Sequence, residues 1–294
     1  MLHVATVIAA SEILDAAVAR LRAALPKVGA IAPLGADAVD IPFSVDDEID
    51  QAGLAERLRA DADLPIDVVI QPAVGRRKRL FLADMDSTMI QQECIDELAD
   101  YVGLKAHVAA ITERAMRGDI AFEPALRERV ALLRGLPISV VDDVVRHRIR
   151  LTPGGRTLVA TMRAHGAHTC LVSGGFTLFA ERIAAMIGFD EVHANALKLD
   201  GERLAGTVAE PIFGRAAKRA TLLGLRTRLG LDKSETLVAG DGANDLDMIA
   251  DAGLGVAFHA KPSVASAAPA RIDHADLTAL LYVQGYRRHE FVEG

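Results

Sequence analysis

The sequence predicts an α/β protein with a parallel sheet, an inserted set of helices and a separate small module in front. Apolar strand segments alternate with amphipathic helical segments, which is typical of a Rossmann-like parallel sheet covered by helices on both faces. One interval of about eighty residues between two strands is too long for a single crossover helix. A glycine- and arginine-rich run at residues 75–79 separates the first strands and helices from the rest.

Composition narrows the class of protein. The chain has 294 residues, a formal net charge of −7 and 51% hydrophobic residues, which suggests about two domains and argues against disorder. The acidic balance argues against a nucleic-acid partner. No stretch approaches the roughly 20 apolar residues of a membrane span, and the N-terminus lacks a basic signal-peptide segment. We expect a cytoplasmic protein with no membrane partner, and Cys94 and Cys170 as reduced core thiols.

Residues 1–75 predict a small α/β module with three strands and two helices. Ser11 precedes a helical pattern and is expected to cap it. The basic run at 75–79 is expected to be a solvated linker. The predicted strands are 3–10, 38–45 and 66–72, and the predicted helices are 12–25 and 51–62.

The sequence of residues 77–294 predicts the larger domain, which contains the parallel sheet. A helical cap is expected at about 91–152, between the first and second strands of this domain. The predicted strands are 79–86, 168–176, 236–245 and 255–260; the predicted helices between them are 153–166 and 177–188, and those of the cap are 95–118, 122–136 and 139–148.

Acidic residues follow two of the predicted strands. Asp84 and Asp86 end the first strand, and Asp241 and Asp245 follow a later one. Because ligands of parallel sheets bind beyond the carboxyl ends of the strands, these carboxylates are expected to share one site. A cluster of acids without His or Cys favours Mg²⁺, which takes oxygen ligands and substrate phosphate.

Glycines at the strand ends favour a phosphate ligand. Ser173-Gly-Gly175 and the loop at 240–242 can offer backbone N–H groups to an anion at close approach. Each motif alone is more often an ordinary turn. Their joint placement at strand ends favours a functional site.

The same residues resemble a known family. FLADMDSTMI, LVSGGF, Lys218 in GRAAKRATLL, and VAGDGANDLDM resemble, in chain order, the four motifs of the haloacid dehalogenase (HAD) superfamily. The resemblance covers about residues 77–285 and includes the cap, whose sequence is closer to the members that hydrolyse O-phosphoserine. Residues 1–75 loosely resemble the ACT-like modules found before some of these domains.

The resemblance implies a role for each motif residue. Asp84 would be the nucleophile that forms an aspartyl-phosphate, and Asp86 the general acid and base. Mg²⁺ would be held by the Asp84 side chain, the Asp86 backbone carbonyl and Asp241, with Asp245 supporting. The residues implied to hold the phosphoryl group or the substrate are Ser173, Gly174, Lys218 and Asn244, with Gly175 supporting.

The cap residues implied to select the substrate are Glu93 and Arg129. A carboxylate suits the ammonium group of phosphoserine, and a planar guanidinium suits its carboxylate. Met116 and Phe122 would close over the substrate. Taken without the resemblance, Glu93 and Arg129 are equally well explained as exposed helix charges, and Met116 and Phe122 as cap core.

The expected activity is Mg²⁺-dependent hydrolysis of O-phosphoserine to serine and phosphate, the last step of serine biosynthesis. One alternative is a related small-molecule phosphatase, or a phosphotransferase acting on an alcohol such as homoserine. The other is a non-catalytic amino-acid sensor. A homodimer is expected by analogy with ACT-like modules.

Overall fold

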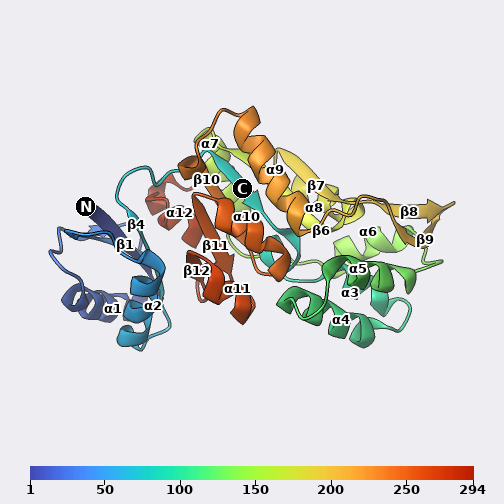
Figure 1. Cartoon of the computed structure of the whole chain (residues 1–294), viewed down its shortest axis with the longest axis horizontal. Helices are drawn as coiled ribbons and strands as arrows, with labels where there is room; N and C mark the ends of the chain where they lie inside the picture. Colours follow the sequence, from blue (N-terminus) through green and yellow to red (C-terminus); the bar gives the residue numbers. More distant parts are fainter.

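The computed structural model describes residues 1–294 as two main sheets with their helices and a small hairpin (Figure 1). The first four strands lie at one end of the molecule and the inserted helices at the other, with the large sheet between them. None of the helices combines the length and apolar composition that a membrane span requires.

The N-terminal sheet is antiparallel, in the order β2-β3-β1-β4. One face is covered by two helices that share a core with the strands. The predicted cap at Ser11 is wrong: Ser11 is the first helical residue, Ala10 precedes it, and no side chain caps the helix. The elements are β1 (Leu2–Ile8), α1 (Ser11–Ala24), β2 (Ala32–Pro33), β3 (Ala38–Ser44), α2 (Gln51–Ala62) and β4 (Asp67–Pro72).

The predicted parallel sheet is confirmed, with six strands in the order β12-β11-β10-β5-β6-β7. Strand β5 (Leu80–Ala83), in the middle of the sheet, is buried on both faces, because Phe81 and Ala83 pack in one core cluster and Leu80 and Leu82 in another. The strands are β5 (Leu80–Ala83), β6 (His168–Phe176), β7 (Glu191–Asn195), β10 (Thr236–Gly240), β11 (Leu254–Phe258) and β12 (Ala270–Ile272).

Helices cover both faces of this sheet. The core cluster that holds Phe81 includes α7 (Gly155–Ala164), α8 (Thr177–Ile187) and α12 (Ala279–Tyr282). The cluster that holds Leu80 includes α9 (Arg215–Arg228), α10 (Leu246–Asp251) and α11 (Pro262–Ala267). This two-sided cover explains why the strands are apolar without alternation.

The insertion between β5 and β6 is helical. It begins and ends close together, since Ile90 pairs with Leu151 in an isolated bridge. Gly103, in the left-handed region at φ 70°, lies between α3 and α4, so the predicted helix 95–118 is two helices. The helices are α3 (Cys94–Asp100), α4 (Lys105–Arg117), α5 (Phe122–Ala131) and α6 (Ser139–His147).

A hairpin that was not predicted from the sequence packs against the insertion. Strands β8 (Leu197–Asp200) and β9 (Arg203–Val208) are antiparallel, and Arg203 pairs with Pro137 of the insertion. Gly201 in the turn has φ 60°. The Asp200-Gly201 pair between two apolar runs is a hairpin signature that could have identified it.

The basic run at 75–79 is not a solvated linker throughout. Arg76 binds Asp40 of β3 through Nη1 at 2.5 Å, with both side chains about nine-tenths buried, and donates to the carbonyl oxygens of Tyr282 and Val283. Lys78 is buried and donates to the Ser234 carbonyl at 2.7 Å. The run therefore attaches the N-terminal sheet to the C-terminal segment, because the Arg76 guanidinium bonds to residues of both.

Candidate active site

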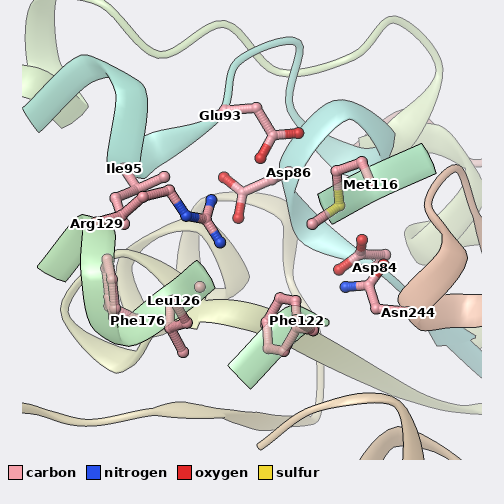
Figure 2. Close-up of a pocket in the computed structure, with 12 residues that line it drawn as sticks. Asp84, Asp86, Glu93, Ile95, Met116, Phe122, Leu126, Arg129, Phe176 and Asn244 are labelled. Carbon is pink, nitrogen blue, oxygen red and sulfur yellow. The ribbon is translucent and has the colours of Figure 1, made fainter. Parts of the chain in front are cut away.

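The polar residues predicted at the strand ends meet at one edge of the large sheet. Strand β5 lies between β6 and β10 in the parallel sheet, so their carboxyl ends adjoin. Asp84 and Asp86 follow β5, Ser173 lies near the end of β6, and Asp241 follows β10. Figure 2 shows Asp84 and Asp86 in a cavity between this edge and the helical insertion.

Lys218 connects two of the acids. It comes from α9 and is fully buried, with Nζ 2.6 Å from Oδ1 of Asp84 and 2.7 Å from Oδ1 of Asp245. Burial lowers the pKa of Lys218, but the charges of Asp245 and Asp84 outweigh it and raise that pKa above its ordinary value. Lys218 therefore stays protonated. Burial and the charge of Asp245 raise the pKa of Asp84 well above its usual range, and the charge of Lys218 opposes this shift.

Asp241, unlike Asp84 and Asp245, forms no ion pair with Lys218 or any other cationic side chain. It is 2% exposed, and its only side-chain hydrogen bond comes from the Thr88 hydroxyl at 3.1 Å. Burial and the nearby charge of Asp84 raise the pKa of Asp241 well above its usual range. Oxygens of Asp84, Asp241 and Asp245 lie within 4.8 Å of one another, an arrangement that suits a hard divalent cation.

Asp86 lies in a different environment from Asp84. Its Oδ1 accepts the backbone N–H of Cys94 at 2.9 Å, and its Oδ2 accepts the Ser173 hydroxyl at 3.4 Å. Burial raises the pKa of Asp86, although the Cys94 N–H opposes the shift. A carboxyl with a raised pKa keeps its proton closer to neutral pH, so it is available there as a general acid.

Glu93 and Arg129 of the insertion face the same cavity (Figure 2). Arg129 is 2% exposed, so it is not a solvated helix charge. Glu93 immediately precedes α3 and accepts the Ser87 hydroxyl at 2.7 Å. Burial and the charge of Asp86 raise the pKa of Glu93 to about 8. A cationic group entering the cavity would favour the ionised form of Glu93.

Two apolar side chains close the cavity from the insertion. Phe122 and Met116 line it (Figure 2) and also pack among other insertion residues. The core offers them glycines: a Cβ on Gly174 would lie 2.7 Å from the Phe122 ring, and one on Gly242 would lie 2.9 Å from the Met116 sulfur. Glycine at these positions therefore permits the insertion to contact the sheet edge.

Gly175 and Asn244 complete the predicted set. A Cβ on Gly175 would lie 2.7 Å from Oδ2 of Asp86, so only glycine leaves that carboxyl its place. Asn244 lines the cavity near Asp84 (Figure 2), and its Oδ1 is buried without a hydrogen-bond partner. The structure thus brings all thirteen predicted site residues to the cavity or its immediate contacts.

Ser87 and Thr88 were not assigned a role from the sequence. Ser87 has a left-handed backbone at φ 55°, which is strained for serine and aims its hydroxyl at Glu93. Thr88 donates to Asp241. Their position directly after the two acids of the DMDST segment was the available signal.

The chain is similar to known phosphatases. Residues 81–250 match the family of haloacid dehalogenase-like hydrolases. A Streptomyces coelicolor protein named phosphoserine phosphatase is 44% identical over 231 residues, which are 78% of this chain but only 56% of that relative. A Schizosaccharomyces pombe protein named probable phosphoserine phosphatase is 40% identical over 238 residues, 80% of each chain.

Similarity to one solved structure extends over nearly the whole chain. A HAD family hydrolase from Salmonella enterica serovar Typhi superposes with a TM-score of 0.84 at 27% identity, covering 96% of this chain and 98% of the other. The N-terminal sheet is therefore included in the similarity.

Proposed function

The chain belongs to the haloacid dehalogenase-like hydrolase family, and we propose that it hydrolyses O-phospho-L-serine to L-serine and phosphate, the last step of serine biosynthesis. The observation that carries the proposal is the shared cavity in which Glu93 and Arg129 face Asp84 and Asp86. Phosphoserine bears an ammonium and a carboxylate beside its phosphate, and the cavity offers one group of opposite charge for each. The relatives named phosphoserine phosphatase support this substrate.

Asp84 and Asp86 divide the chemistry. A carboxylate oxygen of Asp84 attacks phosphorus, the bond from phosphorus to the serine oxygen breaks, and Asp86 gives its proton to that oxygen. Water then attacks phosphorus with Asp86 accepting a proton, which releases phosphate and restores Asp84. Burial raises the pKa of both acids, but only Asp84 has an ion pair with Lys218, which opposes the shift and favours the nucleophilic carboxylate. Asp86 has no such partner, so its burial favours the protonated form.

Donors around the nucleophile would hold the phosphoryl oxygens. Lys218, the Ser173 hydroxyl and the backbone N–H of Gly174 adjoin the position of attack, with Gly175 and Asn244 beside them. In phosphoryl transfer the protein mainly positions groups and stabilises spread negative charge. Met116 and Phe122 would exclude bulk water from these contacts.

Asp84, Asp241 and the backbone carbonyl of Asp86 would hold Mg²⁺, with Asp245 supporting. The fit rests on an all-oxygen donor set and on the buried Asp241 carboxylate, which has no cationic partner in the chain. When bound, the ion would neutralise carboxylate charge and polarise a phosphoryl oxygen.

A phosphate-release screen tests the proposal. The panel contains phosphoserine, phosphothreonine and sugar phosphates, each with Mg²⁺ or with EDTA. We expect phosphoserine to give the highest kcat/KM and EDTA to abolish turnover. A preference for a sugar phosphate would overturn the proposed substrate. Transfer of phosphate to added homoserine in preference to water would indicate a phosphotransferase instead.

A further inference from the structure

We propose that Thr112 and Asp96 are positioning residues that hold Arg129 in the orientation needed to receive the amino-acid end of the substrate. The inference rests on the proposed function and adds two residues that do not touch the substrate themselves. It depends on three helices of the insertion: Asp96 lies on α3, Thr112 on α4 and Arg129 on α5.

Arg129 uses only part of its guanidinium within the protein. Its Nε donates to the Ala125 carbonyl at 3.0 Å, and its Nη1 donates to the Thr112 hydroxyl at 2.9 Å. Nη2 has no hydrogen-bond partner in the chain, and the guanidinium points into the cavity (Figure 2). Two anchors therefore fix the plane of the group and leave one edge open for a carboxylate.

The Thr112 hydroxyl is itself held by Asp96. Its oxygen lies 2.7 Å from Oδ1 of Asp96 and 3.0 Å from the carbonyl oxygen of Val108. A hydroxyl has one proton to donate, and the shorter contact to a carboxylate is the stronger. With that proton directed to Asp96, a lone pair of the oxygen faces Nη1 of Arg129. Thr112 and Asp96 are both buried, so water does not compete for these bonds.

The neutral hydroxyl matters because Arg129 has acidic neighbours. The charges of Glu93, Asp96 and Asp86 all act on its guanidinium. If Arg129 turned to pair with Glu93 or Asp86, each would neutralise the other, and the cavity would lose its contrast between an acidic and a basic end. Thr112 gives the guanidinium a hydrogen-bond partner that is neutral, so the positive charge stays available. The carboxylate of Asp96 is linked to the guanidinium through the Thr112 hydroxyl.

The test compares two substrates in matched threonine variants. Thr112→Val removes the hydroxyl at nearly constant volume, and Thr112→Ser retains it. Thr161→Val is the control, since Thr161 is a fully buried threonine on α7, outside the insertion, whose hydroxyl accepts from the Val292 N–H. KM and kcat are measured for phosphoserine and for p-nitrophenyl phosphate, which lacks the amino-acid end, and the unfolding midpoint is recorded for each variant.

We expect Thr112→Val to lower kcat/KM for phosphoserine about tenfold more than for the aryl phosphate, mainly through KM. Thr112→Ser should restore most of the difference, and Thr161→Val should affect both substrates alike. If Thr112→Val does not fold, Asp96→Asn serves, with an expected preferential loss of about threefold, because the hydroxyl proton is then free to turn to Val108.

Equal losses on both substrates in Thr112→Val, or in Asp96→Asn where that variant is used, would overturn the positioning role and leave the proposed function intact. A wild-type protein that hydrolyses the aryl phosphate but not phosphoserine would overturn the proposed function, and the inference with it.

Discussion

Nζ of Lys218 lies 2.6 Å from Oδ1 of Asp84. The two side chains are 0% and 6% exposed, so water competes little for this ion pair. The pair places a permanent positive charge against the carboxylate proposed to attack phosphorus. Because Lys218 also binds Asp245, one cation serves two buried acids. The local fold and the proposed chemistry therefore depend on the same ammonium group.

Replacing Lys218 by methionine should damage both activity and stability. Loss of a donor to the transferred phosphoryl group should lower kcat about 100-fold or more, and two buried carboxylates left unpaired should cost about 3–5 kcal/mol of unfolding free energy. Steady-state assays and urea unfolding without Mg²⁺ measure the two effects. Lys198→Met, at an exposed position of β8, is the control. A Lys218→Met protein of wild-type stability would show that the pair contributes nothing to the fold.

Arg129→Ala should weaken phosphoserine turnover and largely spare an aryl phosphate. Loss of a desolvated partner for the substrate carboxylate should reduce kcat/KM by the equivalent of about 2–5 kcal/mol. Arg127→Ala on the same helix is the matched control, because Arg127 is exposed and pairs with Glu210. Equal losses on both substrates in Arg129→Ala would refute the assigned role.

Asp86→Asn should allow phosphoenzyme to accumulate with an activated leaving group such as p-nitrophenol. Such a leaving group departs without a proton, so the first step proceeds, whereas water activation in the second step loses its base. Acid quenching followed by peptide mass spectrometry detects phosphate on Asp84. The absence of any adduct under these conditions would count against the acid–base role of Asp86.

The raised pKa of Glu93 predicts a pH-dependent difference in stability between the wild type and Glu93→Gln. An unfolded chain releases this proton near pH 4.5, whereas the folded protein retains it to about pH 8. Between these values the folded state binds more protons, so a rise in pH favours unfolding. Wild-type stability relative to Glu93→Gln should therefore fall from about pH 5 to pH 8. Unfolding midpoints measured over this range in both proteins test it, and a constant difference would contradict the shift.

Much of the sheet and of the catalytic edge could be predicted from sequence. The strands near residues 80, 170 and 237 are continuous apolar runs that end in acids, serine or glycine, and a parallel sheet brings such ends together. The four motifs identified the family, which the family match confirms. The division into 1–75 and 77–294 with a cap at 91–152, the ACT-like character of the N-terminal sheet and the homodimer stay predictions.

What the sequence did not predict depends on partners distant in the chain. Arg76 and Lys78 were interpreted as solvated charges that flank an apolar strand, because their partners, Asp40 and the Ser234 carbonyl, lie far from them in the sequence. Thr112 lies mid-helix in α4, where a threonine commonly bonds its own helix. Its importance is visible only once Asp96 and Arg129 are placed on either side of it.

The attachment of the N-terminal sheet bears on how the protein can be shortened. Ile8, Leu34 and Val69 share one core cluster with Tyr282 and Val283 of the C-terminal segment, so each covers the other from water. A protein truncated to begin after the basic run would expose these apolar side chains of the C-terminal segment to water, which favours aggregation. A minimal version of this enzyme should therefore combine the truncation with polar substitutions on the newly exposed surface.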